Sequence, residues 1–387
     1  MKKIWPFSFY FLFFAAIAAY SPYMVLYLQS LEFTGTQIGV MIGITPLITL
    51  VSVPFWTRLA DRTNGHRWIM SSTMLIGIAS LVILPYLTTY LVVFGLAIFF
   101  NVFFAPVGAL ADSATMFMLG NQKDLFGRLR LGGTIGFGIT ASVAGVFVEN
   151  NGIKAAFWVA AGLFFLGFLV SQQLVHSKGA KVEITQRGGI LELIKSPPWL
   201  IFLLLAFTGG VAFSALNSYF FPFMKELGAD ESTMGLALTI GTIAEIPVML
   251  LVNRMIKRFK AYGLLIFSLV VTGLRFVLLA VAGGPVFVLI FQILNGFTFP
   301  IMWVAGVSYA DENAPEGLRA TVQGLFGAAV LGVGAAVGGF FGGLLLENLG
   351  GQGLYLTIGT AIFVILAIVT AFRRKLPAKI IPASFEL

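Results

Sequence analysis

Long apolar runs separated by short polar breaks extend along nearly the whole chain. Most runs hold about 20 residues or more, which is the helix length that crosses a hydrocarbon layer roughly 30 Å thick. A strand of a membrane β-barrel needs only about 10 alternating residues, so the run lengths predict helices. Twelve membrane segments are expected, at residues 6–30, 36–57, 68–87, 90–118, 126–148, 153–175, 199–224, 233–253, 261–282, 285–310, 319–346 and 353–372.

Composition narrows the class of protein further. Hydrophobic residues make up 58% of the 387 residues, and Asp, Glu, Lys and Arg together only 10%, against roughly 25% in soluble proteins. The chain has 39 Phe and no Cys, which excludes a soluble enzyme, a disordered chain and a disulfide-stabilised scaffold. We therefore predict an all-α polytopic membrane protein.

The basic residues are distributed unevenly between the two sides that an even number of crossings defines. Of the 24 Lys and Arg, 21 lie at the termini or in alternate connections, and the opposite connections hold only Lys154 and Lys225. By the positive-inside rule, this asymmetry predicts that both termini are cytoplasmic. The net charge of +8 then reflects orientation, so the expected partners are membrane lipid and a small solute, with no nucleic acid.

The sequence also carries an internal repeat. The longest polar interval, His176 to Ser196, separates six segments from six, which predicts an N-terminal half at 1–175, a central cytoplasmic loop at 176–198 and a C-terminal half at 199–387. A shift of 196 residues superposes Tyr23 on Tyr219, Gly39 on Gly235, Arg58 on Arg254 and Arg62 on Arg258.

A second repeated pattern lies in the fourth segment of each half. The residues Asn101-Val-Phe-Phe-Ala-Pro106 recur as Asn295-Gly-Phe-Thr-Phe-Pro300. Transporters built from two such halves in the same orientation have a pseudo-two-fold axis along the membrane normal and bind their solute near the midplane. The repeat therefore predicts two pseudo-symmetric six-helix halves and the architecture of alternating-access transport.

Two ionisable residues of the second half lie well inside apolar segments. Glu245 is expected about 12 Å from the cytoplasmic end of the eighth segment, and Arg275 lies inside the ninth. A charge at bilayer depth costs roughly 2.5–3.5 kcal/mol on insertion scales, so such residues are functional candidates. We expect Glu245 and Arg275 to pair and the pair to respond to a proton on Glu245. A purely structural ion pair is the alternative.

The first half offers Asp112 in the fourth segment and Arg130 in the fifth. A carboxylate and a guanidinium that face a watery cavity form a clamp for hydroxyl or carboxylate groups of a solute. Arg128 lies two residues from Arg130 and so points to nearly the opposite side, which favours a role at the cytoplasmic gate. The alternative is a salt bridge at the cytoplasmic end of the two segments.

Uncharged polar residues supply further candidates for solute contact. Tyr20, Tyr23 and Tyr27 are spaced to share one helix face, which we expect to line a cavity; anchoring at the lipid interface is the alternative. Amide side chains in the apolar segments suit hydrogen bonding to a solute, and interhelical hydrogen bonds are an equal alternative. These amide side chains are Asn101, Asn217, Gln292, Asn295 and Gln323.

Other kinds of chemistry find little support in the sequence. The two histidines, His66 and His176, are expected in solvated cytoplasmic loops. The segments show no clustered metal ligands and no nucleophile with an adjacent base, so we expect no metal site, no cofactor other than a coupling proton, and no catalytic residues. The sequence also lacks a Walker A motif, so ATP-driven transport would need a partner chain.

The stretch from Thr57 to Arg67, Thr-Arg-Leu-Ala-Asp-Arg-Thr-Asn-Gly-His-Arg, resembles a loop of the major facilitator superfamily. That loop reads G-x-x-x-D-R-x-G-R-R, and this chain has Thr57 in place of the first Gly and one additional residue before Gly65. The resemblance implies the twelve-helix fold of that superfamily and a cytoplasmic gate that involves Asp61 and Arg62.

The stretch from Gly127 to Phe137, Gly-Arg-Leu-Arg-Leu-Gly-Gly-Thr-Ile-Gly-Phe, is similar to the start of the fifth helix in the lactose permease group of proton symporters. In that group the second arginine and an acidic residue on the preceding helix bind the sugar, and a nearby aromatic residue stacks on its ring. The resemblance implies these roles for Arg130, Asp112 and Phe137.

The stretch Ala244-Glu245-Ile246-Pro247, followed by Arg275, is similar to the eighth and ninth helices of the permease-like group that includes phenylpropionate and nucleoside transporters. Lactose permease has a His and a Glu on the tenth helix as part of its proton site, where this chain has Asn295 and Thr298. Given this departure, Glu245 is the expected proton carrier and Asp112 the second choice, and uniport stays open.

These observations together predict a monomeric secondary transporter of the bacterial inner membrane that moves a small polar solute, preferably a sugar or glycoside, by proton symport. Asp112, Arg130, Phe137, Tyr23, Tyr27, Asn217 and Asn295 are expected to contact the solute. A uniporter, an exporter, and a carrier of aromatic acids or nucleosides are the alternatives within transport. A receptor that does not transport and a membrane enzyme are the alternatives outside it.

Overall fold

The structure is a computed structural model that describes residues 3–175, 196–315 and 318–375. Within these ranges nearly all residues are helical and none forms a strand. Ten described helical stretches are long and apolar enough to cross a membrane. Ala155–Ser171 adds a shorter apolar helix, and the longest stretch is divided by the non-helical backbone of Gly350 (φ 68°, ψ 179°). The predicted all-helical membrane architecture is therefore confirmed.

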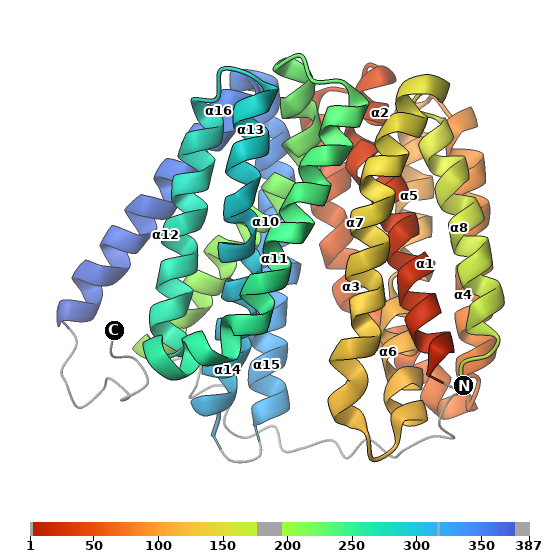
Figure 1. The fold of residues 1–387 in the computed structure, drawn as a ribbon, viewed down its shortest axis with the longest axis horizontal. Coiled ribbons are helices and arrows are strands. Elements are labelled where there is room, and N and C mark those ends of the chain that lie inside the picture. The colour runs from red at the N-terminus through yellow and green to blue at the C-terminus, as the bar shows by residue number, and fades with distance from the viewer. Residues whose placement is uncertain (1–2, 176–195, 316–317, 376–387) are drawn as a thin grey trace. The chain divides into compact units, whose positions relative to one another are not determined.

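Contacts between residues divide the chain into two compact units, in which the long helices run side by side (Figure 1). Unit 1 comprises Met1–Val182 and Ala229–Thr239, and unit 2 comprises Glu183–Gly228 and Ile240–Leu387. The expected central loop falls largely outside the described residues. The division differs from the predicted halves in one respect, because Ala229–Thr239 contacts unit 1.

In unit 1 the first helix contacts both α7 and α8, and α4 contacts α5 and α8. The elements of this unit are α1 (Ile4–Tyr20), the 3₁₀ turn η1 (Ser21–Tyr23), α2 (Met24–Ser30), α3 (Gly35–Thr63), α4 (His66–Ile83), η2 (Leu84–Tyr86), α5 (Tyr90–Phe104), α6 (Pro106–Leu119), η3 (Lys123–Leu125), α7 (Phe126–Asn151) and α8 (Ala155–Ser171).

The elements of unit 2 pack mainly through α10 and α12, both of which contact α16. They are α10 (Pro197–Glu226), α11 (Glu231–Phe259), α12 (Ala261–Ala280), α13 (Pro285–Phe291), the 3₁₀ segment η4 (Gln292–Phe297), α14 (Phe299–Glu312), α15 (Arg319–Gly327), the π-helical η5 (Ala328–Gly334) and α16 (Ala335–Lys375). The first residues of α11 belong to unit 1.

The start of α11 contacts α7 because both helices carry glycine at the contact. A Cβ atom on Gly145 would lie 2.6 Å from the carbonyl oxygen of Glu231, and one on Gly235 would meet the carbonyl of Ala141. Thr239 hydrogen-bonds to Ser142 across the same contact at 2.7 Å. This close backbone approach explains why Ala229–Thr239 clusters with unit 1.

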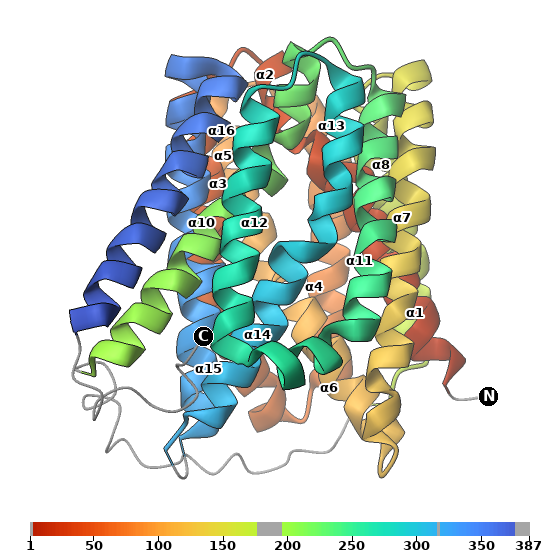
Figure 2. The same cartoon turned by 60° about the vertical axis from the view of Figure 1, so that its left-hand side comes forward.

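The repeated Asn-x-Phe-x-x-Pro pattern interrupts the fourth helix of each half. Proline lacks the N–H group that an ongoing helix needs and suits the first turn of a new one. In unit 1, α5 gives way to α6 at Pro106, whereas in unit 2 the interruption is longer and η4 separates α13 from α14. Figure 2 shows α13 and α14 beside α12 in unit 2.

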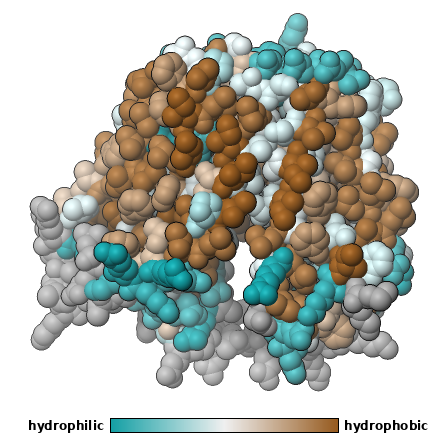
Figure 3. Space-filling model, viewed as in Figure 1, coloured by the Kyte–Doolittle hydropathy of each residue, from teal (hydrophilic) through white to brown (hydrophobic). Residues whose placement is uncertain are grey.

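The outer surface is apolar where lipid is expected. On the face shown in Figure 3, hydrophobic side chains cover the middle of the helices and hydrophilic ones gather at their ends. Val51, Leu91 and Leu250 are each more than 70% exposed. Large apolar side chains in such numbers on a surface indicate contact with membrane rather than water.

Candidate functional site

A buried polar network surrounds Arg275 in unit 2. Arg275 lies on α12 with only 2% of its surface exposed. Its Nη1 atom donates to Asn295 Oδ1 at 2.6 Å and to Thr298 Oγ1 at 3.5 Å. Its Nη2 atom donates to Gln292 Oε1. Three neutral acceptors thus hold a cation that is expensive to place at membrane depth.

The local helix geometry explains why these three acceptors converge. Gln292 and Asn295 lie in the 3₁₀ segment η4, and Thr298 directly follows its last residue. A 3₁₀ helix has three residues per turn, so side chains at positions i and i+3 eclipse one another. The interruption after α13 therefore aligns residues 292, 295 and 298 toward α12 more closely than a regular α-helix, in which they would spread over about 120°.

Asn295 also joins Arg275 to Glu245 on α11. Its Nδ2 atom donates to Glu245 Oε1 at 2.6 Å and approaches the carbonyl oxygen of Gly241 at 3.4 Å. A Cβ atom on the neighbouring Gly296 would collide with the carbonyl oxygen of Ala244. The absence of a side chain at that position lets η4 approach α11 closely enough for Asn295 to reach the carboxylate.

The predicted direct pairing of Glu245 with Arg275 is wrong for this structure. Among the described residues no ion pair joins the two side chains, because the amide of Asn295 lies between them, accepting from one and donating to the other. Glu245 lies in the interior of α11. It lies midway between Glu231 and Phe259, the ends of α11, and thus about 21 Å of helix from either end.

The Nε–H group of Arg275 takes no part in this network. The Nε atom of Arg275 is buried and has no hydrogen-bond partner within the described residues. Hydrogen bonds to ionised groups are roughly twice as strong as neutral ones. A proton added to Glu245 would therefore weaken its bond from Asn295 and alter the hold of Asn295 on Arg275. A change in the protonation of Glu245 on α11 can therefore alter the hydrogen bonds of Arg275 on α12.

A second cluster in unit 1 is formed by Asp112 on α6 and Arg130 on α7. Arg130 Nη1 lies 2.8 Å from Asp112 Oδ2, and the two side chains are 47% and 36% exposed. The Tyr10 hydroxyl on α1 donates to Asp112 Oδ1 at 2.7 Å and lies 3.2 Å from Thr115 Oγ1. The Arg130 guanidinium lies 6.0 Å from the ring centres of Tyr10 and Phe126. The cluster is held by three helices and remains accessible.

The cluster lies toward one end of its helices. Asp112 is about 10 Å from the end of α6 at Leu119, and Arg130 about 6 Å from the start of α7. Phe137 lies about two turns farther along α7 and is half-buried. Arg128 is exposed and makes no hydrogen bond or ion pair with the described residues. Of the residues named for this part of the chain, the structure brings together only Asp112 and Arg130.

The expected cavity-lining role of Tyr23 and Tyr27 does not fit the structure. Both side chains are buried, with 1% and 0% of their surface exposed. The Tyr27 hydroxyl donates to the carbonyl oxygens of Leu84 and Leu87 at 3.0 and 3.2 Å. The segment is not one regular helix, because the 3₁₀ turn Ser21–Tyr23 separates α1 from α2, so the spacing that placed these tyrosines on one accessible face does not apply.

The remaining asparagines have separate surroundings. Asn217 on α10 is exposed, whereas Asn295 belongs to the Arg275 network. Asn101 on α5 donates to the carbonyl oxygen of Ala97 at 2.8 Å and to Thr45 Oγ1 on α3 at 3.3 Å. For Asn101 the structure shows the interhelical hydrogen bond that the sequence left as an equal alternative.

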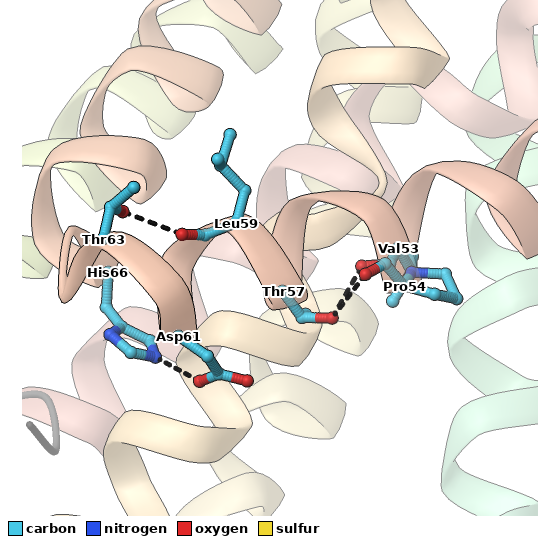
Figure 4. Close-up of polar contacts among 7 residues, drawn as sticks. All are labelled: Val53, Pro54, Thr57, Leu59, Asp61, Thr63 and His66. Atoms are coloured by element: carbon cyan, nitrogen blue, oxygen red, sulfur yellow. Dashed lines mark hydrogen bonds and ion pairs between the residues drawn. The ribbon is translucent and has the colours of Figure 1, made fainter. Parts of the chain in front are cut away.

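The gate residues lie where α3 ends and α4 begins. His66 Nε2 lies 2.9 Å from Asp61 Oδ1, and Figure 4 shows the two side chains facing each other. His66 is 6% exposed, so its expected place in a solvated loop is wrong; it is the first residue of α4 and folds back against α3. Arg62 is exposed, and Asp61 bonds to His66 rather than to Arg62. His176 lies outside the described residues.

Sequence reasoning missed three members of these clusters. Tyr10 and Thr115 contact Asp112, and Gln292, named only as a neutral polar residue, contacts Arg275. Tyr10 is the one phenolic hydroxyl in the Phe-rich stretch that opens α1, which is a usable signal. The signal for Gln292 is its spacing of three residues from Asn295, which places the two side chains on one helix face.

Comparison with known proteins adds independent information. Residues 4–357 match the model of the MFS_1 like family. Maltose permease from Geobacillus stearothermophilus is 26% identical over 380 residues, covering 97% of this chain and 95% of the relative. Xanthosine permease from Escherichia coli is 24% identical, covering 89% and 87%. A probable 3-phenylpropionic acid transporter from the same organism is also 24% identical, covering 97% of both chains.

Solved structures show the same fold. The crystal structure of the nucleoside transporter NupG superposes with a TM-score of 0.83 over 97% of this chain and all of that chain, at 21% identity. A bacterial homologue of the lysosomal transporter Spinster gives a TM-score of 0.71 at 14% identity. With the family match over residues 4–357, the all-helical membrane fold and the repeated fourth helix, this chain belongs to the MFS_1 like family of the major facilitator superfamily of membrane transporters.

Proposed function

We propose that this protein is a proton-coupled symporter of a solute that contains a sugar ring, either a glycoside or a nucleoside. The preference for a sugar ring rests on the solutes for which similar proteins are named, since maltose, xanthosine and nucleosides all carry one. The phenylpropionate relative keeps aromatic acids as the rival class. The proposed location is the bacterial inner membrane with both termini cytoplasmic, and the proposed state is a monomer.

The observation that carries the proposal is the accessible Asp112–Arg130 pair with the Tyr10 hydroxyl. The pair presents a carboxylate acceptor and a guanidinium donor side by side, which matches the acceptor and donor character of vicinal hydroxyl groups on a sugar. Hydrogen bonds to ionised groups are strong. Hydroxyl groups of a bound solute can therefore replace the contact between Asp112 and Arg130 and still give each charged group a hydrogen-bond partner. Phe137, half-buried on α7, is proposed to contact the ring face.

Glu245 is the proposed proton carrier. It is the only acidic residue in the middle of α11, and its contact with Asn295 links it to Arg275. A ligand shifts a conformational equilibrium only through different affinity for the two states. A proton on Glu245 changes the charge balance of the buried network, so its binding can favour one state over the other.

The test is the pH change outside cells or proteoliposomes on addition of disaccharides, monosaccharides, nucleosides or aromatic acids. Alkalinisation with one sugar-bearing class is the expected result. Asp112→Asn and Arg130→Gln should each raise the apparent KM for that solute by about tenfold or more, since loss of a charged hydrogen-bond partner costs about 1.5–3 kcal/mol. Arg254→Gln, which removes an exposed arginine elsewhere, is the matched control and should leave KM unchanged.

Two results would overturn the assignment. Alkalinisation with aromatic acids alone would replace the sugar ring by a carboxylate as the recognised group. Normal transport by the charge-exchanged variant Asp112→Arg with Arg130→Asp would show that the pair is a salt bridge at the membrane surface, because a solute clamp needs each charge in its own place.

A further inference from the structure

A pocket lined mainly by residues with polar side chains lies at one end of unit 1, apart from the clusters described above. It has a volume of about 360 Å³ and opens where α4 begins and α8 ends. These two helices pack against each other, so the pocket lies between neighbouring membrane helices. Its lining residues are Asn64, Gly65, Arg67, Trp68, Ser71 and Gln172.

Among the described residues that line the pocket, Arg67 is the only charged one, and a hydrogen bond orients its side chain. Its Nε atom donates to Gln172 Oε1 at 3.3 Å, and Gln172 in turn donates to Ser71 Oγ at 2.9 Å. The terminal nitrogens of Arg67 have no hydrogen-bond or ion-pair partner in the described parts of the chain. The nearby acid Asp61 is already bonded to His66. The guanidinium is therefore positioned and its positive charge is not balanced.

The aromatic residues place this pocket at the membrane surface. Trp68 is 72% exposed, and Tyr86, near the other end of the same span, is also 72% exposed. Tyr86 contacts Trp158 of α8, with ring centres 6.2 Å apart. The 18 residues from Trp68 to Tyr86 span about 27 Å, close to the thickness of a hydrocarbon core. Tryptophan and tyrosine at this spacing mark the two lipid interfaces.

An apolar surface leads away from the pocket into the membrane. Leu75 lies one turn beyond Ser71 on α4, and Leu169 lies about one turn before Gln172 on α8. Leu75, Phe165 and Leu169 are between 43% and 48% exposed. The site therefore places the Arg67 guanidinium next to an exposed apolar surface on α4 and α8. This combination suits an amphipathic anion better than a free inorganic ion.

We propose that this pocket binds the phosphate headgroup of an anionic phospholipid, with Arg67 as the phosphate ligand, Trp68 at the headgroup boundary and the acyl chains along α4 and α8. The planar fork of arginine matches phosphate geometry in two hydrogen bonds. Basic pockets between membrane helices are suited to anionic headgroups. That this surface is the cytoplasmic one rests on the orientation given under the proposed function; the binding chemistry does not.

The experiment titrates the purified full-length protein in a neutral detergent with phosphatidylglycerol or phosphatidylcholine and follows the thermal midpoint and, by native mass spectrometry, the bound lipid. Wild type is expected to bind phosphatidylglycerol at least about fivefold more tightly than Arg67→Gln, the ratio that corresponds to about 1 kcal/mol per basic residue near an anionic surface. Arg67→Lys keeps the charge without the fork and should fall between them. Gln172→Ala, which releases the fork, should also weaken binding.

Arg254→Gln again serves as the control, since it removes an exposed arginine from the other unit, and it should bind phosphatidylglycerol like wild type. Equal affinity of wild type and Arg67→Gln, or equal binding of phosphatidylcholine, would overturn the proposal. Inorganic phosphate that competes at the same concentration as the lipid would assign the pocket to a free anion. If Arg67→Gln lowers the thermal midpoint in the absence of lipid, the test rests on Arg67→Lys and Gln172→Ala. Binding of phosphatidylglycerol by both variants as tightly as by wild type would then overturn the proposal.

Discussion

The two Asn-x-Phe-x-x-Pro segments occupy the same place in each repeat and yet serve different chemistry. Asn101 donates to Thr45 of α3 and Asn295 donates to Glu245 of α11, so in each half the fourth helix bonds to the second. In the first half both partners are neutral. In the second half the same amide also accepts from Arg275 and lies between two charges.

Small substitutions within the pattern account for the difference. Gly296 stands where the first half has Val102, and it allows the close approach to the Ala244 carbonyl. Thr298 stands where the first half has Phe104 and adds a hydroxyl contact to Arg275. Both copies of the Asn-x-Phe-x-x-Pro pattern thus interrupt their helix and supply an asparagine that bonds to another helix. Only the second copy is part of a buried network of charged side chains. The comparison teaches that pseudo-symmetry of fold does not extend to chemistry.

The largest expected difference between the two copies is in energy coupling. A gradient of one pH unit stores about 1.4 kcal/mol per proton, enough for about tenfold accumulation of solute by one-proton symport. Glu245→Gln should abolish this accumulation in proteoliposomes and leave solute exchange intact, whereas Thr45→Val, its counterpart in the first copy, should retain it. Accumulation by Glu245→Gln equal to wild type would leave the Arg275 network with a structural role only.

The next largest difference is expected in stability. Asn295→Ala removes the amide that donates to Glu245 and one of the three acceptors of Arg275, and the expected loss is about 3 kcal/mol. Asn101→Ala removes one neutral interhelical hydrogen bond, worth about 0.6 kcal/mol in membrane proteins. Unfolding of both variants in the same detergent, followed by circular dichroism, measures the two losses. Equal losses would mean that the charges around Asn295 add nothing to the worth of its hydrogen bonds.

The smallest contrast concerns the residue that follows each asparagine. Gly296→Ala places a methyl group against the Ala244 carbonyl, and such overpacking costs about 1–3 kcal/mol. Val102→Ala only shortens a half-buried side chain, for which about 1 kcal/mol is expected. Thermal unfolding of the two variants measures both losses of stability, and Gly296→Ala is expected to unfold at the lower temperature. If Gly296→Ala were neutral for stability and transport, the close approach of η4 to α11 would not be needed to position Asn295.

The sequence predicted the fold well and the site in part, for identifiable physical reasons. Membrane segments are set by the length of apolar runs, so even the expected segment 36–57 differs from α3 mainly at its polar end. Glu245, Arg275, Asp112 and Arg130 were found because charge at membrane depth is rare. The contact of Asp112 with Arg130 was anticipated, whereas the link from Glu245 to Arg275 through Asn295 was not, since it depends on how η4 interrupts its helix.

Other misplacements have similar local causes. Tyr27 was placed by a 3.6-residue period that fails across the 3₁₀ turn at Ser21–Tyr23. His66 was placed by the polarity of its neighbours, and polarity does not reveal that the chain turns at Asn64 (φ 51°) and Gly65 and brings His66 back to Asp61. In each case a short departure from the regular helix decided the position of a side chain.

The π-helical segment Ala328–Gly334 has a consequence for how the chain tolerates changes of length. Its i→i+5 hydrogen bonds accommodate about one residue more than the α-helix of the same number of turns. After the segment, a Cβ atom on Gly338 of α16 would collide with the carbonyl oxygen of Val211 on α10, so this flank packs closely against α10. Deletion of one residue within 328–334 can revert the segment to α-helix with its flanks in place. The same deletion in α12, which is regular throughout, would turn every later side chain by about 100°. The π-helical segment 328–334 is therefore a place where the chain can lose one residue and a regular helix is not.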